Sequence, residues 1–301
     1  MGSLLLYNIG VIMIGGIYMD YNKEVLDLFK DTKGKYRIVN HYVMDHTYNL
    51  CGTDNRLIDV IHNTNDLSYM VKEEDTLNVL PDGKTDNIIL SKKRTLEAAK
   101  EYKGKRVAIL NFANNHSIGG APWSAGAQEE SLCRISTLYR SQEKFKDEFY
   151  LRHTTMFKKG MMNEMGNDDL IYLPKVCVFK TDESLPLLMN EEDWYYVDVI
   201  TSAAPNLPLA YDLDEYRKII YKRIEKVLQV AKKEKIEILI LGAYGCGAFH
   251  NPPEVVASIF KMLLKQYHFD GVEFAIYCSS YDKFCNYEIF KNILGRKEEE
   301  L

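Results

Sequence analysis

The segment Asn111–Arg134, NFANNHSIGGAPWSAGAQEESLCR, decides the fold. It follows the apolar run Val107–Leu110, which predicts a buried strand, and it contains a Gly119-Gly120 turn. After a spacer, Gln128-Glu129-Glu130 opens an apolar-periodic helix. Strand, glycine-rich loop and helix start are typical of a site for a phosphorylated ligand, because helix N-terminal N–H groups point outward and carry partial positive charge. Two carboxylates there suit a sugar, or acid–base chemistry beside the phosphates.

A second unit of the same kind lies nearer the C-terminus. The run Ile236–Leu241 predicts a strand, and the glycine-rich loop Gly242–Pro253 follows it directly. Within that loop Asn251 can cap the next predicted helix, Glu254–Tyr267, and a proline can start it. Two such loops could donate to a diphosphate from both sides.

These segments resemble the microbial-type branch of the poly(ADP-ribose) glycohydrolases. Gly119-Gly120-Ala121, six residues and Gln128-Glu129-Glu130 are similar to the family pattern GGG-x(6–8)-QEE, with Ala121 in place of the third glycine. The segment Val199–Asn206 is similar to the family element VITxAAPN. The resemblance covers roughly residues 76–280. It implies an α/β, macrodomain-like, three-layer α/β/α fold with a mixed central sheet, which binds ADP-ribose at the strand C-terminal ends.

The resemblance also implies an activity, the hydrolysis of O-glycosidic ribose–ribose bonds in poly(ADP-ribose) with release of ADP-ribose. It makes Glu130 the catalytic glutamate, Glu129 a neighbour that holds the ribose at the scissile bond, and Asn114 a residue that orients the same ribose. The candidate substrate-binding residues are Asn114, Gly119, Gly120, Ala121, Gln128, Gly245, Cys246, Gly247, Ala248 and Phe249.

Glycosidic cleavage needs a protonated carboxyl for the leaving oxygen and a carboxylate to accept a proton from water. Our hypothesis is that Glu130 does both, and that an ionised Glu129 and the ligand diphosphate favour its protonated form. Taken alone, the two acids could merely complement the helix dipole. Two alternative functions remain: a mono-ADP-ribosyl hydrolase acting on modified protein or nucleic acid, and a non-catalytic ADP-ribose binding module.

The composition narrows the class of protein. With 301 residues, 46% of them apolar and 27% charged, the chain is typical of globular proteins, and its net charge of −5 argues against broad nucleic-acid binding. Six scattered cysteines predict reduced, mostly buried thiols in a cytoplasmic protein, with nuclear access left open. We favour Cys246 as a small loop residue over a nucleophile. We expect no metal, no cofactor, a monomer, and ADP-ribose or poly(ADP-ribose) on modified proteins as the partner.

The sequence predicts three parts: an N-terminal accessory segment over residues 1–75, the glycohydrolase domain over 76–295 and a solvated tail over 296–301. Residues 1–18 form an apolar leader, which is shorter than the roughly 20 residues of a membrane helix. It could be an added strand, a leader before a start at Met19 or a weak anchor, and we favour the first two. A helix is expected over residues 22–30, with polar, turn-rich chain after it.

The remaining expectations are more local. Predicted elements are strands over 76–80, 175–179, 197–201 and 272–277, helices over 91–102, 129–140, 213–234 and 282–294, and a surface excursion over 145–171. Arg134 should make an internal ion pair or cap a loop. His116 and His250 could contact ligand or merely be polar loop residues, and Trp123 and Tyr244 could line the site or pack beneath it.

Overall fold

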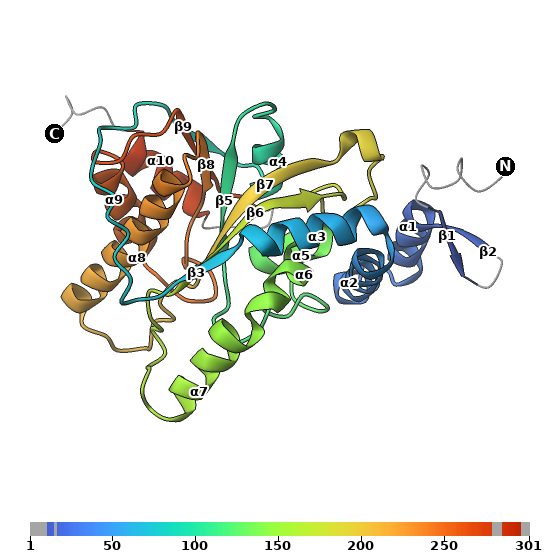
Figure 1. The fold of residues 1–301 in the computed structure, drawn as a ribbon, viewed down its shortest axis with the longest axis horizontal. Helices are drawn as coiled ribbons and strands as arrows, with labels where there is room; N and C mark the ends of the chain where they lie inside the picture. The colour runs from blue at the N-terminus through green and yellow to red at the C-terminus, as the bar shows by residue number, and fades with distance from the viewer. Residues whose placement is uncertain (1–10, 15–16, 279–284, 296–301) are drawn as a thin grey trace.

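A seven-stranded mixed sheet forms the centre of the computed structural model, which describes residues 11–14, 17–278 and 285–295. The strand order is β3-β6-β7-β5-β8-β9-β4 (Figure 1). The bounds are β3 Tyr69–Val71, β4 Ile88–Ser91, β5 Val107–Phe112, β6 Leu170–Val178, β7 Tyr195–Ser202, β8 Ile238–Leu241 and β9 Gly271–Ala275. Strands β7, β5, β8, β9 and β4 run parallel, whereas β6 is antiparallel to β7 and to β3.

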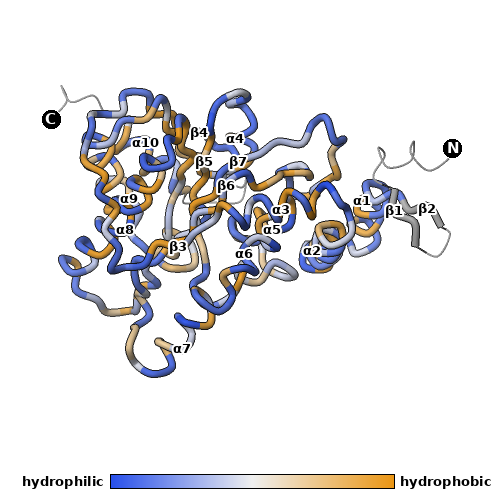
Figure 2. The backbone as a smooth tube through the Cα atoms, viewed as in Figure 1, coloured by the Kyte–Doolittle hydropathy of each residue, from blue (hydrophilic) through white to orange (hydrophobic). Residues whose placement is uncertain are grey.

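The central strands are apolar throughout because both faces of the sheet are covered. Strand β8 is buried along its whole length, and β5 from Val107 to Asn111. Continuous apolar runs, rather than alternating ones, are what a parallel sheet between two helical layers requires. Figure 2 shows hydrophobic residues concentrated on these strands.

Two helical layers enclose the sheet. The helices of the domain are α4 Thr95–Lys100, α5 Gln128–Ile135, α6 Leu138–Gln142, α7 Arg152–Lys158, α8 Leu213–Lys233, α9 Pro253–Leu263 and α10 Asn286–Leu294. Helices α8, α9 and α10 pack on one face, where Ile224 and Phe260 meet Leu110 of β5. Helices α4, α5 and α6 pack on the other, where Leu132 meets Ile109. The predicted α/β/α fold with a mixed sheet is confirmed.

The N-terminal part is more helical than the sequence predicts. After the hairpin β1 Val11–Ile14 and β2 Ile17–Asp20 come α1 Tyr21–Asp31, α2 Tyr36–Thr53 and α3 Asn55–Leu67. The expectation of polar, turn-rich chain after the first helix is therefore wrong. Leu57 and Ile61 of α3 pack with Phe179, and β3 joins the main sheet. The domain boundary after residue 75 stays a prediction.

Several local expectations also need correction. The helix predicted over 129–140 is interrupted at Ser136 and Thr137, because Ser136 bridges to Val178 and the Thr137 N–H donates to the Cys177 carbonyl. Residues 91–102 contain only the short α4, and residues 76–80 form no strand. The excursion predicted over 145–171 follows the helical turn η2 Glu143–Phe145, contains η3 Lys146–Leu151 and α7, and ends in the first residues of β6. The predictions for residues 1–10, 15–16, 282–284 and 296–301 lie outside the described residues.

The prediction of six free thiols is wrong for one pair. Cys278, after β9, and Cys285, before α10, form a disulfide with their Cα atoms 5.8 Å apart. A separation of seven residues does not by itself mark the two cysteines as partners. Cys51, Cys133, Cys177 and Cys246 are free.

Candidate active site

A cavity of about 460 Å³ lies where β5, β8, β9 and β4 end. This is the edge at which parallel sheets bind ligands, because the connections open there. Of the residues predicted from the sequence, the cavity is lined by Asn114, Gln128, Glu129, Glu130, Gly245, Gly247, Ala248 and Phe249. The segment Gly119–Ala121 stands next to Glu130, outside this lining, and Cys246 is not part of the wall either.

Glu129 is the more deeply buried of the two acids at the start of α5. Its side chain accepts hydrogen bonds from Asn111 Nδ2 at 3.1 Å and from the Asn114 N–H at 2.7 Å. Burial nevertheless dominates and raises its pKa to about 8. Burial therefore favours the protonated form of Glu129, whereas the sequence led us to expect an ionised neighbour beside Glu130.

Glu130 is held by the glycine turn. The Ala121 N–H donates to Glu130 Oε1 at 3.2 Å. A Cβ added at Gly120 would lie 2.5 Å from the same oxygen, and Gly119 and Gly120 both have positive φ, at 63° and 67°. Ala121 is not among the described residues with positive φ, so its methyl group causes no backbone strain. The turn needs glycine at its first two positions only.

The Gln128 side chain holds the start of α5 in place. Its Oε1 accepts from the Phe112 N–H at 2.8 Å, and its Nε2 donates to the Leu110 carbonyl and to Thr95 Oγ1. Both ends of the amide are thus used within the protein. Gln128 joins the start of α5 to β5 and to α4, which fixes where the two glutamates emerge.

Asn114 presents one side-chain atom to the cavity. Its Oδ1 accepts from the backbone N–H groups of His116 and Ser117, at 2.7 and 2.9 Å. No partner for its Nδ2 occurs within the described ranges, so this donor is available to a ligand hydroxyl. His116 is therefore fixed at the turn that carries Asn114.

The second glycine loop is held by Asn251. The Asn251 Nδ2 group donates to the carbonyls of Pro205, Gly245 and Phe249, at 2.7, 3.1 and 3.2 Å. Tyr216 donates from its hydroxyl to Asn251 Oδ1 at 2.9 Å. These contacts bind the loop to the turn after β7. Its backbone N–H groups can then face the cavity at Gly247 and Ala248.

The remaining sequence candidates have structural roles. Arg134 donates to the carbonyls of Pro122 and Ala125 and so caps the first loop. Tyr244 is fully buried, with its hydroxyl 2.8 Å from Ser202 Oγ, and Trp123 donates to Asp45 on α2. Burial raises the pKa of Cys246 to about 12, so this thiol is not a nucleophile at neutral pH.

The far end of the cavity was not found from the sequence. Arg94, Asp182, Tyr277 and Asn286 line it, and the Arg94 guanidinium lies 4.2 Å from the centre of the Tyr277 ring. Asp182 accepts from the Leu96 N–H at the start of α4, and burial raises its pKa. These residues come from distant segments without a shared motif, so no local pattern marks them.

The described part of the chain contains neither a candidate metal centre nor a candidate membrane-spanning helix. No group of three or more His, Cys, Asp or Glu side chains is arranged to hold a metal ion there. Across the same residues, no helix combines the length and the apolar character needed to cross a membrane.

Its layers, its mixed sheet and a ligand cavity at the strand ends make this chain a macrodomain-like α/β protein. Residues 24–181 match the family described as microbial-type PARG, catalytic domain, and the chain belongs to that family. It is thus an enzyme of the glycohydrolase class.

Solved structures give the same relationship. The chain is similar to the poly(ADP-ribose) glycohydrolase of Thermomonospora curvata bound to the inhibitor ADP-HPD, with 29% identity and a TM-score of 0.73 over 84% of this chain and 98% of that one. It is also similar to the enzyme of Deinococcus radiodurans in complex with ADP-ribose, with 26% identity and a TM-score of 0.68 over 78% and 96%. No curated protein sequence matches the chain.

Proposed function

We propose that this enzyme hydrolyses the ribose–ribose bonds of poly(ADP-ribose) and releases ADP-ribose. The observation that carries the proposal is the pair Glu129 and Glu130 at the start of α5, in a cavity that is also lined by the glycine loop Gly245–Phe249, whose backbone can bind a diphosphate. The solved relatives that bind ADP-ribose or ADP-HPD support the same ligand class.

Glu130 is the proposed acid and base. In the first step it donates its proton to the leaving 2′-oxygen while the bond from that oxygen to the anomeric carbon breaks. Water then adds to the oxocarbenium-like carbon and returns a proton to Glu130, which restores the starting state.

The other residues orient the substrate. Asn114 Nδ2 binds the hydroxyls of the ribose at the scissile bond, and neutral Glu129 holds the Asn114 backbone through its hydrogen bond. The Gly245–Phe249 loop binds the diphosphate and Phe249 packs against the distal ribose, while the Gly119–Ala121 turn holds Glu130. We further propose a cytoplasmic monomer that needs no metal or cofactor.

Glu130→Gln tests the proposal. The amide keeps the shape of the side chain but removes the transferable proton, so kcat on poly(ADP-ribose) should fall by about 10²–10⁴-fold. Calorimetry should show that the affinity for ADP-ribose is retained. Near-wild-type turnover by the variant would refute the role of Glu130.

The wild-type protein distinguishes the rival functions in the same assay. Release of ADP-ribose from the polymer supports the proposal. Turnover of a mono-ADP-ribosylated peptide alone would favour the mono-ADP-ribosyl hydrolase, and binding without any turnover would favour a binding module.

A further inference from the structure

Helix α7 projects from the body of the molecule next to the turn that carries Asn114 (Figure 1). Its end presents Phe157, Lys158 and Lys159 to solvent, and Phe157 is 43% exposed. An exposed aromatic residue next to two cations is typical of surfaces that bind single-stranded nucleic acid, where bases stack and phosphates pair with lysines. None of these three residues has a role in the site described above.

Phe157 is connected to the cavity through His116 and Asn114. The ring of Phe157 packs against His116 with 5.4 Å between centroids and 62° between planes. His116 is in turn bound through its backbone N–H to Asn114 Oδ1 at 2.7 Å. The pair His116 and Phe157, which we call the aromatic platform, is therefore joined by one side chain to the cavity.

The platform is held in place by a buried hydrogen-bond network. His153 of α7, 1% exposed, contacts the Asn115 carbonyl through Nδ1 at 3.3 Å and Asp169 through Nε2 at 2.7 Å. The two contacts place the ring between the Asn114 turn and the start of β6, and its N–H donates to at least one of these two acceptors. Helix α7, which carries Phe157, is therefore fixed to the body of the protein.

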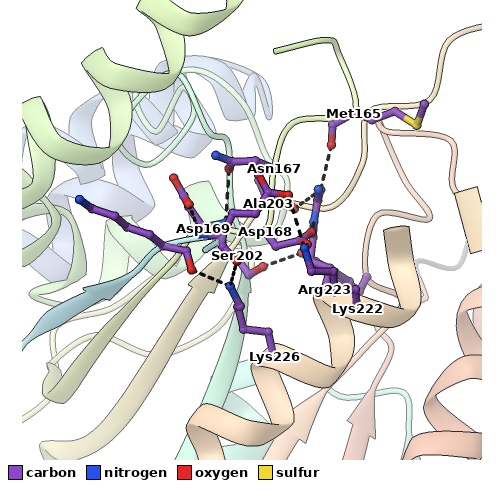
Figure 3. A network of polar contacts seen from close by, with 12 residues as sticks. Met165, Asn167, Asp168, Asp169, Ser202, Ala203, Lys222, Arg223 and Lys226 are labelled. Carbon is purple, nitrogen blue, oxygen red and sulfur yellow. Dashed lines mark hydrogen bonds and ion pairs between the residues drawn. The ribbon is translucent and has the colours of Figure 1, made fainter. Parts of the chain in front are cut away.

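A second network anchors the chain between α7 and β6 (Figure 3). Arg223 of α8 is buried, and it donates to Asp168 Oδ1 at 3.0 Å and to the carbonyls of Met165 and Ala203, each at 2.9 Å. Lys222 pairs with the other Asp168 oxygen at 2.9 Å. This segment is therefore fastened to the turn after β7, beside the second glycine loop.

The local charge suits an anion. No ion pair involves Lys158 or Lys159 within the part of the chain that the structure describes, and both side chains are exposed. Arg152, at the opposite end of α7, is neutralised by Asp169. The protein as a whole has a net charge of −5, so these two unpaired lysines form a local positive surface. Such a surface favours a phosphate-bearing partner at this point.

We propose that the platform binds the polymer unit that becomes the leaving group. The scissile bond joins the ribose at Asn114 to the 2′-oxygen of the next adenosine, so that adenine must leave the cavity within one sugar of the cleavage point. Its base stacks on the exposed ring of Phe157, which His116 supports through an edge contact, and the diphosphate beyond the base lies near Lys158 and Lys159. The proposal rests on the proposed function and explains how a chain would be chosen over a single ADP-ribose.

Steady-state kinetics on short poly(ADP-ribose) test the platform. Phe157→Ala should raise KM about ten-fold with little change in kcat. Phe157→Trp should keep the wild-type KM, because indole also stacks on a base. Lys158→Ala with Lys159→Ala should raise KM and weaken its salt dependence. The affinity for free ADP-ribose, measured by calorimetry, should stay within about two-fold in each variant. Tyr36→Ala, which removes an aromatic residue of similar exposure (48%) on α2, is the matched control.

Each contrary result is informative. A polymer KM unchanged in Phe157→Ala would overturn the platform, as would an equal loss of polymer and ADP-ribose affinity, which would mean local unfolding. If the wild type binds ADP-ribose but cleaves no substrate, the proposed function is refuted while the platform proposal still stands. The platform is then decided by the affinity for intact polymer, expected to be about ten-fold lower in Phe157→Ala than in wild type.

Discussion

Glu129 shows how one buried proton links stability to pH. Its folded-state pKa of about 8 exceeds the ordinary value of 4.5 because of burial. The folded protein therefore holds a proton that the unfolded chain releases, and this stabilisation is lost as pH rises from about 4.5 to 8. Glu129→Gln has no such loss.

Urea unfolding at both ends of this window measures the effect. The stability of wild type relative to Glu129→Gln should fall by a few kcal/mol from the acidic to the alkaline end, since each pKa unit corresponds to about 1.4 kcal/mol. A pH-independent difference would show that Glu129 is not a buried neutral acid.

Gly120 and Ala121 make a matched pair for substitution. A methyl group at Gly120 would meet Glu130 Oε1, so Gly120→Ala should displace the acid and lower kcat by at least about ten-fold. Ala121→Gly removes a methyl group that the structure accommodates without strain, and kcat should stay within about two-fold. Equal effects of the two substitutions on turnover would contradict this account of the turn.

At the same scale, the sequence predicted the residues that lie close together in the chain. The spacing of the glycine turn and the acids locates Glu129, Glu130 and Asn114, because a strand, a loop and a helix start place them at one sheet edge. Arg94, Asp182 and Tyr277 meet only in the folded chain, so no local spacing marks them. The raised pKa of Glu129 comes from burial in the folded protein, and the residues next to Glu129 in the sequence do not reveal that burial.

At the scale of elements, long apolar-periodic segments were predicted correctly, and the errors have physical causes. Helix α8 follows its stripe of apolar residues from Leu213 to Lys233. By contrast, α2 has only a weakly amphipathic sequence, and it buries Asn40 and Thr47 against other parts of the chain. The interruption between α5 and α6 comes from pairing with β6 across about forty residues, which periodicity does not show.

At the scale of the molecule, the N-terminal helices are part of the structure that supports the site. Asn40 of α2 donates to the Ala125 carbonyl in the first loop, and Thr47 donates to the Arg134 carbonyl on α5. The buried Lys180 amine donates in turn to Thr47 and to the Val43 carbonyl. We therefore infer that the accessory segment supports the candidate active site directly.

Two shortened chains test this inference. A chain starting at residue 76 should fail to unfold cooperatively in circular dichroism, because it exposes the apolar surface that α2 and α3 cover. A chain starting at residue 20 retains α1, α2 and α3 and should melt within a few degrees of the full chain. Cooperative melting and ADP-ribose binding by the shorter chain would refute the supporting role.

The reversed direction of β6 separates two tasks in this fold. The parallel strands deliver the phosphate loops and the acids as they leave the sheet, whereas β6 enters the sheet at that same edge, and α7 precedes it. The segment 159–164, which precedes the buried contacts of Met165 and Asp168, can therefore change in length without shifting any strand exit. Evolution could in this way change the surface that contacts the leaving group while the catalytic residues keep their positions.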